Sequence, residues 1–74
     1  MYKVDTKALQ KAMIDLDIKT IEQLSEITGV NRNTLSDIIN GKIFPSSMVM
    51  AKLAHCLHLT SEEAGRIFFT PKLA

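Results

Sequence analysis

Residues 20–41 read TIEQLSEITGVNRNTLSDIING and contain two helical patterns separated by Gly29. In the first pattern, Thr20 and Gln23 have the spacing of a capping box, which begins a helix. Its apolar stripe recurs at helical intervals and consists of Ile21, Leu24 and Ile27. Since glycine readily adopts a positive φ, Gly29 is suited to a tight turn. The sequence therefore predicts a short helix that stops at a glycine turn.

A second amphipathic helix is expected directly after that turn. Asn31 is a suitable N-cap, and Asn40-Gly41 tolerates the left-handed conformation in which helices often end. The apolar face between them consists of Leu35, Ile38 and Ile39. Two short amphipathic helices joined by a tight turn, the second opening with polar side chains, are typical of a helix-turn-helix that reads the DNA major groove.

Helices are also predicted on both sides of this stretch. One begins at Asp5 or Thr6, ends near Leu16, and has a core face of Leu9, Ala12, Met13 and Leu16. Another begins at Ser46 or Ser47 and has a core face of Val49, Leu53, Cys56 and Leu57.

The last predicted helix runs from Ser61 to Phe69, because Thr60 and Glu63 have the spacing of a second capping box. Its inward face consists of Ala64, Ile67 and Phe68. Residues 1–4 are expected to form an arm or a short extended segment, and residues 70–74 a tail that follows the helix. The sequence thus predicts an all-α fold, a compact bundle of about five short helices in one domain spanning residues 1–74.

Composition limits the class of protein. The 74 residues are 46% hydrophobic and 23% charged, as in ordinary globular domains, and the single cysteine rules out an internal disulfide. No apolar run approaches the ~20 residues of a membrane span and the N-terminus lacks the apolar core of a signal peptide, so we expect a cytoplasmic protein. The net charge is only +1, which is weak support for a nucleic-acid partner, although one face can still be basic.

The chain from Thr6 to Phe69 resembles the lambda-repressor-like, Cro/XRE-type helix-turn-helix family. The residues that carry the resemblance are Leu24, Ser25, Gly29, Val30, the run Asn31 to Ser36, Ile38 and Asn40-Gly41-Lys42. Farther along they are Pro45-Ser46, Lys52-Leu53-Ala54, Leu57, and Thr60 with Glu63-Ala64. The resemblance implies a bundle of four or five helices whose third helix enters the major groove. It also implies a small Cro-like transcriptional repressor of phage or prophage origin that binds operator DNA as a homodimer.

The resemblance assigns roles to particular residues. The base-facing positions are Arg32, Asn33, Ser36 and Asp37. The positions that meet the phosphate backbone, through side chains or through backbone N–H groups at helix starts, are Thr20, Asn31, Asn40, Lys42, Ser46 and Ser47. Arg32 is the strongest candidate, because arginine binds guanine O6 and N7 bidentately, which is worth about 1–3 kcal/mol of discrimination. The alternative for Arg32 is a solvated position near Glu22 or Glu26.

Two departures from the family pattern favour a second hypothesis. Many members have a phosphate-binding glutamine directly after the cap of the second helix, where this chain has Ile21, and the reading helix carries Asp37, which repels phosphates. Together with the low net charge, these residues suggest a modulator or anti-repressor that uses the same fold to bind a partner repressor protein.

Other groups of side chains bear on partner contacts, metals and catalysis. A possible dimer or partner contact is assigned to Ile67, Phe68 and Phe69. Ile67 and Phe68 can be buried in the bundle, whereas Phe69 either covers the edge of the domain against the first helix or forms part of that contact. His55, Cys56 and His58 lie close in sequence, but neighbouring helical positions diverge by about 100°, so no metal site is expected. No nucleophile, base and orienting group, and no phosphate-binding loop, are found. We therefore expect neither an enzyme nor a cofactor.

Overall fold

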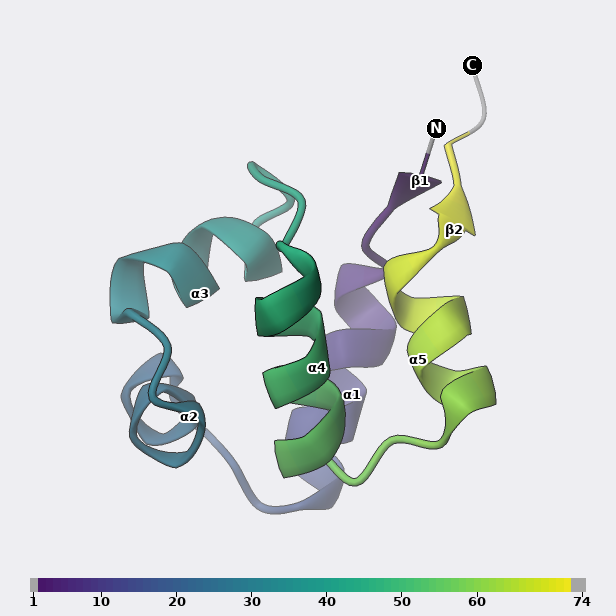
Figure 1. Ribbon diagram of the computed structural model, residues 1–74. Coiled ribbons are helices and arrows are strands. Elements are labelled where there is room, and N and C mark those ends of the chain that lie inside the picture. The colour runs from purple at the N-terminus through teal and green to yellow at the C-terminus, as the bar shows by residue number, and fades with distance from the viewer. Residues whose placement is uncertain (1, 73–74) are drawn as a thin grey trace.

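Each helix begins next to a side chain that caps it. In the computed structural model, which describes residues 2–72, the helices are α1 (Thr6–Asp15), α2 (Ile21–Thr28), α3 (Arg32–Ile39), α4 (Ser47–Cys56) and α5 (Ser61–Phe68) (Figure 1). The caps, which accept a backbone N–H two or three residues ahead, are Asp5, Thr20, Asn31, Ser46 and Thr60. Such caps stabilise a helix by about 0.5–2 kcal/mol each. The predicted all-α bundle of five helices is confirmed.

Both predicted capping boxes are formed. The Gln23 side chain accepts the Thr20 N–H at 3.1 Å, and the Glu63 side chain accepts the Thr60 N–H at 2.9 Å. The Thr60 N–H, and after it the Thr60 hydroxyl, hold the pKa of the Glu63 carboxyl below its ordinary value of 4.5, with smaller contributions from the positive charges of Arg66 and Lys11. The box at α5 is therefore sensitive to acid.

We expect the Glu63 carboxyl to titrate at lower pH in the native chain than in a Thr60→Ala variant. Because the folded-state pKa is depressed, the box adds stability above the pKa of Glu63 in the unfolded chain and loses it as the pH falls through the folded-state value. NMR titration of the Glu63 side-chain carbonyl in both proteins measures this. Thr60→Ala keeps the Thr60 N–H and removes only the hydroxyl, so equal midpoints would show that the hydroxyl does not lower the pKa of Glu63.

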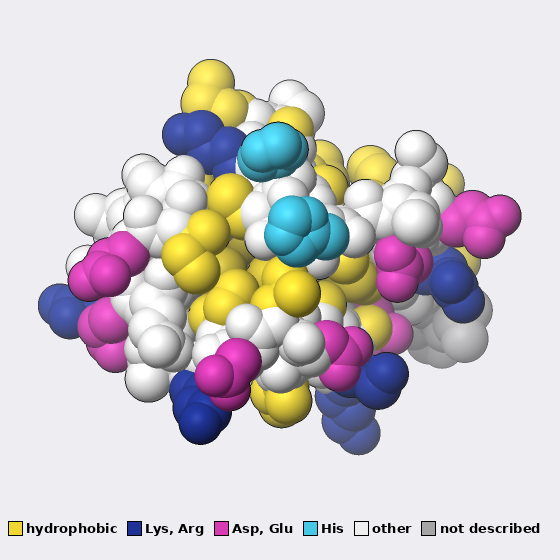
Figure 2. Space-filling view, turned by 90° about the horizontal axis from the view of Figure 1, so that it is seen from below, with side chains coloured by type: hydrophobic (Ala, Val, Ile, Leu, Met, Phe, Trp, Pro, Cys, Tyr) yellow, Lys and Arg dark blue, Asp and Glu magenta, His cyan; other side chains and the backbone are white. Residues whose placement is uncertain are grey.

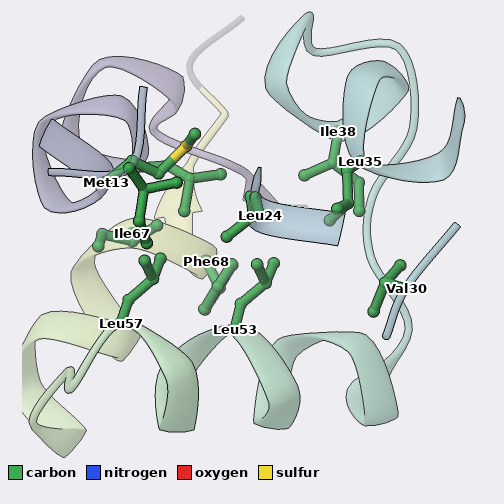
Figure 3. Packing of buried hydrophobic residues seen from close by; sticks show 11 residues of the cluster. Met13, Leu24, Val30, Leu35, Ile38, Leu53, Leu57, Ile67 and Phe68 are labelled. Carbon is green, nitrogen blue, oxygen red and sulfur yellow. The ribbon is translucent and has the colours of Figure 1, made fainter. Parts of the chain in front are cut away.

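The core takes residues from every helix and from three connections. It consists of Leu9, Met13, Ile18, Leu24, Val30, Leu35, Ile38, Leu53, Leu57, Ile67 and Phe68. Figure 3 shows Leu53 of α4 and Leu57, the C-cap of α4, pointing toward Phe68 and Ile67 of α5, with Leu24 of α2 across from them. Because α2 and α3 both contribute to this core, their orientation depends on the whole bundle.

Two residues predicted to be in the core are exposed. Leu16 is 40% exposed, because α1 ends at Asp15 and the chain turns at Asp17, whose φ is +60°; Ile18 enters the core instead. Ile27 is 50% exposed. Successive steps of three residues drift around a helix, so the buried row continues from Leu24 to Thr28, four residues on, rather than to Ile27.

The two ends of the chain pair with each other. Strand β1 (Tyr2–Lys3) lies antiparallel to β2 (Thr70–Pro71), with Tyr2 opposite Pro71 and Lys3 opposite Thr70. The Asp5 N–H donates to the Ile67 carbonyl at 2.7 Å and extends this connection. The expectation of a tail after the last helix is corrected for residues 70 and 71, which form β2, while residues 73 and 74 of that tail and Met1 of the arm lie outside the described residues.

Candidate nucleic-acid interface

A glycine turn separates α2 from α3, as the sequence predicts. Gly29 has φ +73° and its N–H donates to the Ser25 carbonyl at 2.8 Å. A Cβ at this position would meet no atom within 4 Å, so the positive φ, not lack of space, favours glycine. The Asn31 side chain then accepts the Asn33 N–H at 2.7 Å and begins α3. This turn sets the direction in which α3 leaves α2.

Two hydroxyl groups fix the residue after the glycine. Thr28 is buried, and its Oγ1 donates to the Leu24 carbonyl at 2.8 Å and accepts the Val30 N–H at 3.2 Å. The Ser25 Oγ donates to the Val30 carbonyl at 2.7 Å. Both polar groups of the Val30 backbone are thus satisfied while its side chain lies in the core. The sequence analysis did not single out Thr28; its only signal was a hydroxyl four residues after buried Leu24.

Replacing Thr28 by valine should destabilise the domain by about 1–3 kcal/mol, because a buried Val30 N–H loses its acceptor. Thr28→Ser is the matched control, since it keeps the hydroxyl and removes only a methyl group. Urea unfolding followed by circular dichroism measures both variants. A serine variant that loses as much stability as the valine variant would show that the hydroxyl is unimportant.

The outer face of α3 is polar over its whole length. Its core side is fixed by Leu35 and Ile38, and the opposite side consists of Arg32, Asn33, Ser36, Asp37 and the cap Asn40. Arg32 and Asn33 are exposed, and Ser36 and Asp37 are half-buried one turn later. The Asn40 amide donates to the Ser36 hydroxyl at 3.3 Å. The structure thus brings the four predicted base-reading residues together on one helical face.

Arg32 makes only a weak contact within the chain. Its guanidinium lies 3.9 Å from the Glu22 carboxylate of α2, and the two side chains are 64% and 60% exposed. Exposed pairs of this kind contribute about 0–1 kcal/mol. Arg32 therefore lies near Glu22 in this structure, which was the alternative position for it. Because the ion pair is weak, Arg32 can leave Glu22 for a stronger partner with little loss of free energy.

The end of α3 is closed by its own backbone. The Asp37 carbonyl accepts the Lys42 N–H at 2.8 Å, and Gly41 takes a φ of +75°. The predicted phosphate-contacting residues Asn40, Lys42, Ser46 and Ser47 are exposed along the connection from α3 to α4. Thr20 lies apart from them at the start of α2, where its hydroxyl is already used by the Gln23 N–H.

The predicted partner contact at the end of α5 is corrected for two of its three residues. Ile67 and Phe68 are 5% and 1% exposed and lie in the core (Figure 3), whereas Phe69 is 46% exposed. Adjacent helical residues point about 100° apart, so the two phenylalanines face in different directions.

The end of the molecule opposite the termini carries the two histidines. Figure 2 shows both histidines, His55 and His58, over apolar side chains bordered by acidic groups. The Cys56 thiol donates to the Ile27 carbonyl at 3.6 Å and joins α4 to α2. Among residues 2–72, no group of three or more His, Cys, Asp or Glu is placed to hold a metal ion.

The comparison with known families agrees with this geometry. A family model described as a helix-turn-helix domain matches residues 6–64, which is well over half of the chain. The chain belongs to this helix-turn-helix domain family. The match covers α1 to α4 and the start of α5, and therefore includes the turn and the polar face of α3. The searches of curated proteins and of solved structures returned no match.

The family is one of DNA-binding regulatory domains, which suggests a DNA-binding regulator. Within residues 2–72, no helix has both the length and the apolar composition needed to cross a membrane.

Proposed function

We propose that this protein is a sequence-specific DNA-binding transcriptional regulator, a small Cro-like repressor of phage or prophage origin that acts in the cytoplasm. It reads the major groove with the helix from Asn31 to Asn40. The observation that supports the proposal is the position of Arg32 and Asn33, both exposed in the first turn of α3. The N-terminal residues of a recognition helix are those that reach base edges.

The side chains on α3 have complementary chemistry for the bases. Arg32 donates to guanine O6 and N7 after releasing Glu22, and Asn33 pairs with adenine N6 and N7. Ser36 is small enough to allow close approach, and Asp37 accepts from the N4 amino group of cytosine. These four positions define a half-site of only a few base pairs. Two copies on a palindromic operator therefore form the expected working unit, which represses by blocking polymerase.

The phosphate contacts come from the flanking segments. Lys42 provides the one positive charge directly after α3, and Asn40 adds a neutral donor. Backbone N–H groups at the starts of α2, α3 and α4, next to Thr20, Asn31, Ser46 and Ser47, add further donors. Since these contacts are few, affinity should depend on two copies binding together.

A second function is favoured by Asp37 and Ile21. Asp37 is half-buried in the middle of the polar face of α3, where a phosphate would be repelled, and Ile21 provides no donor at the start of α2. Both residues suit a protein surface better than a nucleic acid. In this alternative, the chain is a modulator or anti-repressor that binds a partner repressor protein through the same face.

A mobility-shift assay on the DNA upstream of the gene distinguishes the two functions. Direct operator binding predicts a shifted band with the protein alone, and its affinity should fall steeply as salt rises. No shift with the protein alone, together with a supershift or loss of a band formed by the neighbouring repressor, would favour the modulator.

A further inference from the structure

Three exposed aromatic rings meet near the paired ends of the chain. The rings of Tyr2 in β1 and Phe69 after α5 are 5.4 Å apart edge to face, and those of Phe44 and Phe69 are 6.2 Å apart. Their exposed fractions are 54% for Tyr2, 46% for Phe69 and 45% for Phe44. The chain has four aromatic residues, so three of them lie in this aromatic cluster and only Phe68 is in the core.

The aromatic cluster exposes a substantial apolar area. An aromatic side chain buries about 150–250 Å² when fully covered, so three half-exposed rings present roughly 200–400 Å² of apolar surface. That approaches the size of the largest apolar patch on a typical monomer, about 300–600 Å², which often marks an interaction site. The aromatic cluster is therefore a candidate contact surface.

The neighbouring sheet points to a second copy as the occupant. Within residues 2–72 the sheet has only β1 and β2, so each strand has an open edge. Pro71 in β2 has no N–H to donate to another strand, whereas β1 contains no proline. A strand that pairs antiparallel with its own copy satisfies a two-fold axis, so two β1 edges would form one four-stranded sheet. Tyr2 would then bring both aromatic clusters together.

The charges around the aromatic cluster are self-complementary. A shallow groove beside Phe69 and Pro71 is bordered by Asp5, Glu62 and Arg66. Lys3 on β1 is exposed and carries the opposite charge to the two acids. In a symmetric contact each copy supplies both the lysine and the groove, which is the arrangement that a two-fold interface requires.

We propose that the aromatic cluster and the β1 edge form the contact between two copies of this chain. A standard interface buries about 800 Å² from each partner, of which the aromatic rings supply at most about half, so the dimer should be weak without DNA. This contact would explain how two copies bind paired half-sites, and in that role it rests on the proposed function. The association itself needs no DNA.

The position of the aromatic cluster leaves the polar face of α3 free. Figure 1 shows α3 and the sheet at opposite sides of the upper part of the molecule. Two copies joined at their β1 edges would therefore keep both reading helices away from the contact.

Sedimentation equilibrium of the full chain without DNA tests the contact, at concentrations from micromolar to millimolar. We expect a monomer–dimer equilibrium that Tyr2→Ala and Phe69→Ala each weaken at least about tenfold, as hot-spot residues do. Ile14→Ala is the matched control, because Ile14 is 69% exposed on α1 and should leave the dissociation constant unchanged. Circular dichroism of each variant confirms that it is folded.

Three results would overturn the proposal. They are a monomer at every concentration, a dimer that neither aromatic variant weakens, and a dimer that Ile14→Ala weakens as much as they do. A monomer would leave the aromatic cluster to a different protein partner. Because DNA is absent, DNA binding by a chain that does not self-associate would refute this contact alone. Self-association without any DNA binding would refute the proposed function alone.

Discussion

Replacing Phe68 by alanine should remove roughly half of the protein's stability. Phe68 is 1% exposed and lies between α4 and the other helices (Figure 3), and truncating a buried phenylalanine costs about 3–5 kcal/mol. A domain of this size has a total stability of about 5–10 kcal/mol. The loss of 3–5 kcal/mol should lower Tm by at least about 12 °C, measured by thermal unfolding.

The neighbouring residue provides the control for this effect. Phe69→Ala removes the same atoms one position along the chain, where the ring is 46% exposed and contacts mainly Tyr2 and Phe44. Its cost should be clearly smaller, since the ring is already about half exposed and its two aromatic pairs contribute about 0.5–1.5 kcal/mol each beyond area burial. If the two variants lost similar stability, the packing of the core around Phe68 would be wrong.

Arg32→Ala should abolish most of the sequence discrimination. Losing a bidentate contact to guanine costs about 1–3 kcal/mol, or roughly 5- to 150-fold in affinity for the operator. Binding to random DNA should change far less, because it depends on phosphate contacts spread over other residues. Fluorescence anisotropy with operator and random duplexes at one salt concentration measures both effects.

Lys7→Ala is the matched control for that experiment. It removes one positive charge from an exposed residue on α1, outside the helix-turn-helix and outside the proposed dimer contact, so it should leave the ratio of operator to random affinity unchanged. Arg32→Lys should behave like the alanine variant, because lysine keeps the charge without the bidentate geometry. An equal loss of that ratio in the Lys7 and Arg32 variants would show that net charge, not base reading, governs binding.

Local sequence rules predicted the helices because the signals for them are local. Thr20 with Gln23 and Thr60 with Glu63 were recognisable as capping boxes, and both are formed. Gly29 was assigned to a left-handed turn from the same reasoning, and its φ is +73°. Each of these features depends on residues no more than a few positions apart, which the sequence displays directly.

Features that depend on distant residues were not predictable in the same way. The aromatic cluster joins Tyr2, Phe44 and Phe69, and no periodicity links positions so far apart. The pairing of β1 with β2 also joins residues from opposite ends of the chain, so no local pattern predicts it. Ile27 was wrongly predicted to face the core, and the burial of Thr28 was not predicted, because the direction of the core, not the apolar character of a residue, decides which side of α2 faces inward.

The candidate reading face was largely predictable, but its use was not. Once α3 and its core side Leu35 and Ile38 were identified, the positions of Arg32, Asn33, Ser36 and Asp37 on the outer side followed from helical geometry. Helical geometry says nothing about whether DNA or a protein covers that face. Asp37 is chemically compatible with either partner, so binding has to be measured.

Selection of bound duplexes from a random-sequence DNA pool tests the central claim most directly, because it assumes no operator. The proposed function predicts enrichment of one palindromic sequence with guanine in each half-site, and no such enrichment by the Arg32→Ala protein. Failure of the folded native protein to enrich any sequence at low salt would contradict DNA reading by α3.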